Sequence, residues 1–278
     1  MRISPKYTQI GAVALLGTAT VLTIAILIFI IIFVLQKGLP ILSFDFLFTN
    51  PSDMGRSGGI LPILIGTILL PVVAIIIAAP LGIGTSIYLV EFTNESRVTR
   101  LIRFGTDCLA GVPSIIFGLF GFIFFVTILG MGWSIMSGGL SLALMILPTI
   151  IRTAEEAIRS VPKSYREVSY SLGASRWQTV RKVIIPNALP GIVTGVVLGI
   201  GRSIEETAVV IFTAGSSLLI PTSLFDSTRT MAVHFYILAR EGLSMENAYG
   251  TAAALIIAVL IVNLSAYLMM HRFISKRN

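Results

Sequence analysis

Long uncharged apolar runs alternate along the chain with short polar segments. A helix that crosses a bilayer needs about 20 apolar residues, and the run from Ile10 to Leu35 offers 26 residues without a charge. The uncharged stretch from Cys108 to Ile151 has 44 residues, which suits two helices joined by a tight turn near Gly130 and Gly132. The pattern therefore predicts an all-α, polytopic membrane protein that forms a single transmembrane domain over residues 1–278. Its six transmembrane helices are expected at about residues 10–35, 61–90, 108–129, 135–152, 187–212 and 248–270.

The composition agrees with a protein that has the bilayer as its solvent. Hydrophobic residues make up 55% of the chain, charged residues only 12%, and the mean hydropathy is +0.93, whereas soluble domains carry roughly 25% charged residues. The lone cysteine, Cys108, excludes an internal disulfide, and the distant histidines His234 and His271 make a poor metal site. No GxxxxGK[ST] phosphate-binding loop occurs. The chain is therefore not expected to be an enzyme. We expect no catalytic residues, no metal and no cofactor, and we expect that the chain does not itself hydrolyse nucleotide.

The positions of the basic residues predict the orientation, because cytoplasmic loops are enriched in lysine and arginine. With the N-terminus inside, the inner segments hold 15 basic residues and the outer segments hold four. Both termini are therefore expected in the cytoplasm, and the net charge of +7 is attributed to inner loops rather than to nucleic-acid binding. Residues 213–247 are expected to form an outer loop, with a re-entrant segment as the alternative. The inner basic residues are Arg2, Lys6, Arg97, Arg100, Arg103, Arg152, Arg159, Lys163, Arg166, Arg176, Arg181, Lys182, Arg272, Lys276 and Arg277; the outer ones are Lys37, Arg56, Arg229 and Arg240.

The cytoplasmic segment 153–186, between the fourth and fifth spans, has local structure of its own. The run from Ser164 to Glu167 fits an S-x-x-E capping box at a helix start, and Gly173 stands where a left-handed residue ends a helix. The run from Ser175 to Gln178 fits a second capping box, and Pro186 is expected to end the second helix. Two short helices hinged at Gly173 could lie among lipid headgroups or dock a cytoplasmic partner. Their apolar faces are expected to carry Tyr165, Val168 and Leu172 in the first helix and Trp177, Val180 and Ile184 in the second.

This segment resembles the EAA loop of ABC importer permeases. The family pattern is EAA, three residues, a glycine, nine residues and I-x-L-P; here Glu167-Val168-Ser169 is followed by Gly173 and then by Val183-Ile184-Ile185-Pro186 at the same spacing. In that family the first helix is a coupling helix that docks into a groove on the ATPase subunit. The resemblance implies that the coupling residues are Ser164, Glu167, Val168, Ser169, Leu172, Gly173 and Ala174.

Charged residues stand inside the fifth span. Arg202 lies 14 residues beyond Ala188, about 21 Å into a hydrocarbon core about 30 Å thick, and a charge there is costly. Glu205 and Glu206 follow at i+3 and i+4, within reach along one helix face. They could neutralise Arg202 in an internal ion pair, or line a solute pathway with it, since a guanidinium suits oxyanions. The preceding tandem GxxxG of Gly191, Gly195 and Gly199 is expected to pack against another helix.

The charged run is similar to that of PstA-type permeases of phosphate importers, which carry a GxGR-x-x-GET-like run followed by FTAG. Arg202, Glu206 and Thr207 match, Phe212 to Gly215 reads FTAG, and Glu205 stands where the family usually has glycine. The run from Gly111 to Gly121, GVPSIIFGLFG, is also family-like. The resemblance implies a type I ABC importer permease with Arg202, Glu205, Glu206 and Thr207 along the phosphate pathway.

The same resemblance implies partners and a location. The partners are a second permease of the PstC type, a dimer of ATPase subunits, an extracytoplasmic phosphate-binding protein, phosphate and membrane lipid, with no nucleic acid. The location is the plasma membrane of a prokaryote. Three alternatives stay open: a permease for molybdate, sulphate or phosphonate; a stand-alone channel or secondary transporter; and a membrane enzyme, which lacks an acid, base or nucleophile cluster beyond the two glutamates.

Overall fold

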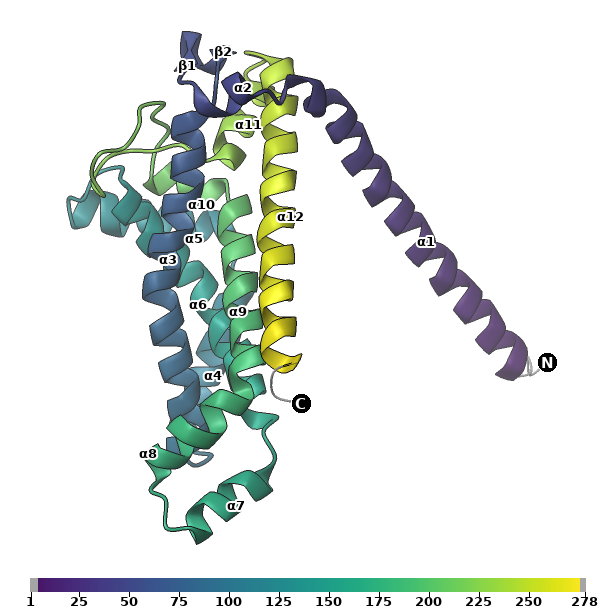
Figure 1. Ribbon diagram of the computed structural model, residues 1–278, viewed down its shortest axis with the longest axis vertical. Helices are drawn as coiled ribbons and strands as arrows, with labels where there is room; N and C mark the ends of the chain where they lie inside the picture. The colour runs from purple at the N-terminus through teal and green to yellow at the C-terminus, as the bar shows by residue number, and fades with distance from the viewer. Residues whose placement is uncertain (1–4, 276–278) are drawn as a thin grey trace.

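The computed structural model describes residues 5–275 and is almost wholly helical (Figure 1). The α-helices are α1 (Pro5–Gly38), α2 (Phe44–Phe48), α3 (Leu61–Ile87), α4 (Arg97–Ala110), α5 (Ser114–Gly121), α6 (Ile135–Arg159), α7 (Lys163–Ser171), α8 (Arg176–Thr179), α9 (Ile185–Glu205), α10 (Ala208–Thr213), α11 (Met231–Arg240) and α12 (Met245–Ser275). Short 3₁₀ turns are η1 (Leu39–Ile41) and η2 (Asp53–Gly55); π-helical segments are η3 (Tyr88–Phe92), η4 (Phe122–Ile128) and η5 (Val180–Ile184). The strands β1 (Pro51–Ser52) and β2 (Ser57–Gly58) pair as a small antiparallel hairpin.

Five described helices are long and apolar enough to cross a membrane: Ala12–Ile41, Leu61–Phe92, Ile135–Arg159, Arg176–Glu205 and Met245–Leu268. The remaining predicted span, 108–129, which is the third along the chain, is not one straight helix. Its first residues end α4, and the chain then bends by 100° into α5 and η4. Gly111 and Pro113 lie at this bend, where Pro113 precedes the first residue of α5. The prediction of six spans therefore holds when the bent pair is counted as one.

The core of the bundle lies between α3, α6 and α9. Leu70, Ile146 and Ile150 are fully buried there. Glycines allow the helices to approach closely: a Cβ on Gly82 of α3 would lie 2.7 Å from Cγ2 of Ile150, and a Cβ on Gly191 of α9 would lie 2.5 Å from Cβ of Ala157. A Cβ on Gly195, one turn further along α9, would collide with Thr153. The predicted packing of the tandem GxxxG is confirmed, and its partner is α6.

The fifth span differs from the sequence prediction in two ways: an expected break at Pro186 is absent, and an unexpected break is present at Glu206. Pro186 was expected to end the second loop helix, but α8, η5 and α9 follow one another without interruption. Pro186 stands in the first turn of α9, where the missing N–H is tolerated, and the π-helical turn before it changes the hydrogen-bond register. The actual break falls later, at Glu206, whose extended backbone separates α9 from α10 inside the predicted span 187–212.

The first helix leans away from the bundle (Figure 1). None of the most apolar part of the Ala12–Ile41 segment is buried within the chain. Its contact with the body is at its C-terminal end, where a Cβ on Gly38 would collide with the backbone of Tyr249 and the ring of Phe33 lies 6.0 Å from that of Tyr249. The side of α1 is therefore open to lipid or to another subunit.

A small cap closes the end of the bundle opposite α7 (Figure 1). The Asn247 side chain donates to the backbone oxygens of Gly55 and Arg56. Gly55 has φ +91° and approaches the fully buried ring of His234 on α11, so that a Cβ there would lie 2.7 Å from Cε1. The predicted loop 213–247 thus contains a partly buried ten-residue helix, α11, packed against α12 and α3.

The N-terminal end of α1 and the C-terminal end of α12 both point to the half of the molecule that carries α7 (Figure 1). This arrangement agrees with two termini on one side of the membrane, and their placement in the cytoplasm stays a prediction. Three basic residues behind that prediction, Arg2, Lys276 and Arg277, lie outside the described residues.

Candidate functional site

The first of the two predicted capping boxes in the segment 153–186 is wrong. Helix α7 begins at Lys163, directly after Pro162, and no side chain caps its start. Ser164 therefore lies inside the first turn instead of before it. Proline fixes φ near the value that a helix start requires, so the helix begins earlier than the S-x-x-E pattern predicts. Glu167 is left exposed, with its carboxylate unused by the cap.

The second half of the segment follows the sequence prediction. Gly173 has φ +80°, the left-handed conformation that ends a helix, and a Cβ there would meet nothing within 4 Å. Ser175 and Gln178 form a complete capping box: the Ser175 hydroxyl accepts from the Gln178 backbone N–H, and the Gln178 side chain accepts from the Ser175 backbone N–H. The hinge at Gly173 and the short helix before it are confirmed, but the helix after the hinge is not short, because it continues from Arg176 to Glu205.

Helix α7 presents its predicted apolar face outward. Tyr165, Val168 and Leu172 are 48%, 60% and 83% exposed. In contrast, Ser169 is buried, and its hydroxyl lies 2.8 Å from that of Thr179 at the end of α8. The serine in the second alanine position of the EAA pattern thus joins the two helices. Ala174 is half-buried behind the turn, and the predicted apolar residues Val180 and Ile184 are fully buried.

Arg166, which the sequence analysis counted only as a cytoplasmic charge, holds α7 to the body. Its Nη2 lies 2.6 Å from Oε1 of Glu91 in η3, which continues the C-terminal end of α3, and both side chains are largely buried. The guanidinium also donates to the backbone oxygens of Ile158 and Val161 at the end of α6. One side chain therefore joins the ends of two transmembrane helices to the loop. A carboxylate directly after the second span was the available sequence signal for its partner.

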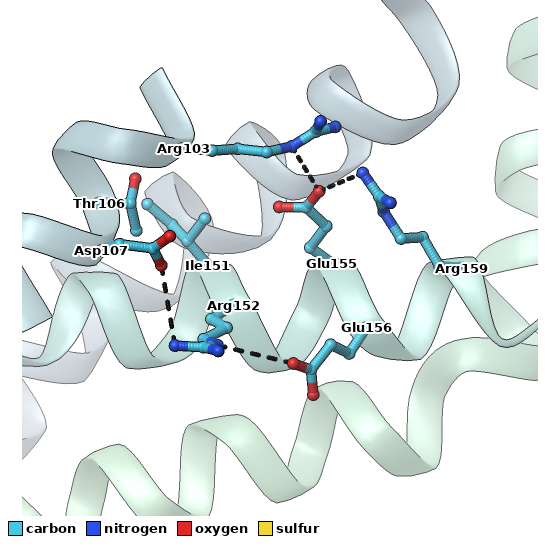
Figure 2. A pocket seen from close by; sticks show the side chains of 8 residues that line it. All are labelled: Arg103, Thr106, Asp107, Ile151, Arg152, Glu155, Glu156 and Arg159. Carbon is cyan, nitrogen blue, oxygen red and sulfur yellow. Dashed lines mark hydrogen bonds and ion pairs between the residues drawn. The ribbon is translucent and has the colours of Figure 1, made fainter. Parts of the chain in front are cut away.

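A pocket of about 270 Å³ lies between α4 and α6 on the same side of the protein (Figure 2). Figure 2 shows Glu155 between two arginines, 2.8 Å from Nε of Arg103 and 2.8 Å from Nη2 of Arg159. In a second group of charged side chains, Arg152 lies 3.7 Å from Asp107 and 3.6 Å from Glu156. Three arginines thus meet three carboxylates, so the pocket has no excess charge for an anion and serves to pin α4 to α6.

The second predicted site lies where α9 ends. Arg202 is the last basic residue of α9, and Glu206 forms the extended break after it. The break removes the i, i+4 helical relation on which the predicted ion pair depended. Among residues 5–275, none forms an ion pair or hydrogen bond with Arg202 that would neutralise it. Arg202, Glu206 and Thr207 are half-buried, and Glu205 is exposed.

The Glu206 carboxylate has other neighbours. It faces the hydroxyl of Ser114, the first residue of α5, and the backbone N–H of Val209 in α10, with the Arg202 charge also near. Thr207 stands before α10 without a capping hydrogen bond from its side chain. The four predicted residues therefore share one region at a break in a membrane helix, and no ion pair joins Glu206 to Arg202 among the described residues. Ser114 lies in the family-like run that starts at Gly111, but no local spacing linked it to Glu206.

The chain was compared with known families and proteins. The family model "Binding-protein-dependent transport system inner membrane component" matches residues 78–278. A "Probable ABC transporter permease protein YqgI" of Bacillus subtilis is 35% identical, and the match covers 94% of each chain. A "Phosphate transport system permease protein PstA 1" of Mycobacterium tuberculosis is 37% identical over 80% of this chain and 73% of that protein.

Solved structures share the fold at low sequence identity. A chain of the MetNI methionine ABC transporter in an inward-facing conformation is 17% identical, with a TM-score of 0.66 over 77% of this chain and 95% of that one. A chain of a bacterial alginate ABC transporter in complex with its pentasaccharide-bound periplasmic protein is 18% identical, with a TM-score of 0.66 over 96% and 97%. The fold is therefore that of an ABC importer permease, a multi-pass protein of the prokaryotic inner membrane. The chain belongs to the family of binding-protein-dependent transport system inner membrane components.

Proposed function

We propose that this chain is a permease subunit of an ATP-driven phosphate importer and forms half of its translocation pathway. The observation that carries the proposal is Arg202, a guanidinium in a spanning helix that no described side chain neutralises. A charge within a membrane span is costly, and an oxyanion ligand would offset that cost. An oxyanion crossing a low-dielectric span needs a fixed positive group in return.

The matched relatives support phosphate as that oxyanion. Several of them are named phosphate transport system permease proteins PstA, including those of Mycobacterium tuberculosis and Mycobacterium leprae, at 37% and 38% identity. Glu206 and Thr207 accompany Arg202 as predicted for that type. Glu205, in place of the usual glycine, adds an exposed negative charge beside the site, which would favour release of the anion.

A second permease of the PstC type would complete the site. Glu205 is exposed and Arg202 half-exposed on the surface of a single chain, and charged surface that faces lipid is disfavoured. Helix α1 also leaves a long apolar side uncovered. A partner subunit that covers both features would enclose a pathway between the two chains.

Coupling to ATP would pass through α7. Its exposed face, with Tyr165, Val168, Leu172 and Glu167, would be the docking surface for a cytoplasmic ATPase dimer, and Gly173 with Ala174 forms the turn behind it. Ser164 and Ser169 lie on the same helix, the first exposed and the second buried against Thr179. Hydrolysis of ATP is assigned to that partner, and delivery of phosphate to an extracytoplasmic binding protein.

Uptake of radiolabelled phosphate into vesicles that contain the complete transporter tests the proposal. ATP-dependent uptake that an excess of arsenate abolishes, but sulphate and molybdate leave unchanged, is the expected result. Competition by sulphate or molybdate instead would assign the permease to another oxyanion. Uptake that continues without the ATPase would favour a channel or secondary transporter.

A further inference from the structure

A second pocket, of about 430 Å³, lies between α7, α8, η3 and the end of α6. Its volume falls in the range of about 300–1,000 Å³ that small-molecule sites occupy. Four basic and two acidic residues line it, whereas the neighbouring pocket of Figure 2 has three of each. The second pocket therefore has an excess of positive charge that the first one lacks. Its basic residues are Arg159, Lys163, Arg166 and Arg176, and its acidic residues are Glu91 and Glu167.

The ion pairs of the protein account for only part of this charge. Arg166 and Arg159 are already paired with carboxylates, at 2.6 and 2.8 Å. Lys163 and Arg176 form no ion pair with any residue in the part of the chain that the structure describes. Glu167, the remaining carboxylate of the lining, can offset only one of these two cations. At least one positive charge is thus left for a ligand.

The other groups around the pocket suit a phosphate group. The Arg176 guanidinium lies over the ring of Phe92, 6.0 Å from its centroid, which restrains its position. Asn94 and Tyr170 contribute an amide and a phenol, which also donate hydrogen bonds. Lys163 begins α7 at a helix start that no side chain caps, and the partial positive charge of a helix N-terminus adds to that of the ammonium. Charged and neutral donors around one cavity match the several acceptor oxygens of a phosphate group.

Helix α7 separates this pocket from the proposed docking surface. Lys163, Arg166 and Tyr170 are spaced i, i+3 and i+7, so they share the face of α7 that lines the pocket. Val168 and Leu172 lie on the opposite face and are exposed. A ligand in the pocket would therefore join α7 to α8 and η3 from behind the docking surface.

We propose that this pocket binds a phosphate group, carried either by inorganic phosphate or by the headgroup of an anionic phospholipid. Both sources present the same anionic oxygens. The pocket lies where the second and fourth spans end, and basic pockets at such positions bind lipid headgroups. The bound group would bridge Lys163 and Arg176 and so stiffen the attachment of α7 to the bundle. This inference does not depend on which anion the permease carries.

Hydrogen exchange of residues 163–176, measured in the complete transporter, tests the proposal without reference to transport. In nanodiscs of phosphatidylcholine, inorganic phosphate at about ten times its Kd should slow this exchange about tenfold. The Arg202→Gln background removes any contribution from the proposed pathway. In a second arm without added phosphate, phosphatidylglycerol replaces part of the phosphatidylcholine. Slowing in the first arm identifies free phosphate as the ligand, and slowing in the second identifies a lipid headgroup.

Three double variants connect the effect to the pocket. Lys163→Gln/Arg176→Gln removes both unpaired cations and should abolish the slowing. Lys163→Arg/Arg176→Lys retains both charges and should keep most of it. Arg181→Gln/Lys182→Gln is the matched control, because it removes two exposed basic residues of the same segment that do not line the pocket. The control should respond to the ligand as the parent protein does.

Three outcomes would overturn the proposal. The first is exchange that neither phosphate nor phosphatidylglycerol slows. The second is equal slowing by chloride at the same ionic strength, which would indicate screening and not a site. The third is slowing that persists in Lys163→Gln/Arg176→Gln. A transporter that shows the expected slowing but takes up no phosphate would instead refute the proposed substrate and leave the pocket standing.

Discussion

Arg166 and Glu91 form a largely buried ion pair, with Nη2 2.6 Å from Oε1, between α7 and the C-terminal end of the second span. The two residues are 75 positions apart in the chain. Because the same guanidinium also donates to two carbonyl oxygens at the end of α6, a force applied to α7 reaches α3 and α6 through one side chain. This pair links α7 directly to the transmembrane bundle.

Glu91→Ala is expected to uncouple ATP hydrolysis from uptake. Loss of one partner leaves a buried guanidinium uncompensated, which costs about 3 kcal/mol and loosens α7. Thermal unfolding in detergent and the ratio of phosphate taken up to ATP hydrolysed measure both effects. Asp107→Ala is the control, because its pair with Arg152 is exposed and 3.7 Å long, worth at most about 1 kcal/mol. Equal losses in the two variants would contradict a special role for Glu91.

Gly173→Val should weaken docking of the ATPase through backbone strain. A Cβ at Gly173 meets nothing, so the cost comes from φ +80° alone, about 1–2 kcal/mol for an L-residue. Gly173→Asn, which tolerates this conformation, should retain most coupling. Co-purification of the ATPase with each variant is the measurement. Wild-type recovery with Gly173→Val would show that the turn has no part in docking.

Glu167→Lys should reduce coupling without reducing stability. Glu167 is exposed and makes no capping box with Ser164, so only the charge on the docking surface changes. The unfolding temperature should stay at the wild-type value while ATP-driven uptake falls. A drop in unfolding temperature of several degrees would instead indicate an internal contact for this side chain.

Arg202→Gln should stop phosphate uptake, because the amide keeps some hydrogen bonding but removes the charge. Arg202→Lys should restore uptake only in part, since an ammonium lacks the planar fork, and Glu205→Gly should be mild. The deciding measurement is uptake by the double variant Arg202→Gln/Glu206→Gln. Near-normal uptake there would make the two charges a structural pair, whereas continued loss supports a role for Arg202 toward the anion.

Residues 216–244 are expected outside and residues 152–182 inside. Single cysteines at the exposed positions Ser223 and Ser171, each in a Cys108→Ser background, test this orientation. An impermeant thiol reagent added to intact cells should label Ser223→Cys and leave Ser171→Cys unlabelled until the membrane is opened. The reverse labelling would invert the topology.

The outer cap is expected to loosen in acid. Burial, together with the Arg229 guanidinium 3.2 Å from Nδ1, lowers the pKa of His234 from 6.5 to about 3. The unfolded cap therefore binds a proton more readily than the folded one, so stability is complete above pH 6.5 and falls toward pH 3 by about 1.4 kcal/mol per unit. Hydrogen exchange of residues 50–59, corrected for the intrinsic rate, should accelerate between pH 6.5 and 4. His234→Gln should remove this pH dependence, and persistence of the dependence would assign it to another group.

Local and periodic signals determined much of this protein. Apolar runs of membrane-spanning length, the left-handed turn at Gly173, the capping box of Ser175 and Gln178, and the close-packing glycines of α9 all follow from short-range rules of helix chemistry. Each of these features needs only neighbours within one or two turns. The structure agrees with the sequence at the turn, the cap and the glycines, and at the apolar runs except for the bend in 108–129 and the break at Glu206.

Only the tertiary structure decided the breaks and the long-range contacts. Pro186 does not end a helix, because it stands in the first turn of α9 after a π-helical segment. The helix instead ends before Glu206, although no glycine or proline stands at that break. The pairing of Glu91 with Arg166 and the approach of Ser114 to Glu206 depend on which helices become neighbours. Such contacts join residues tens of positions apart, and no spacing within one helix encodes them. The physical reason is that a buried polar group takes whatever partner the packed helices bring within reach.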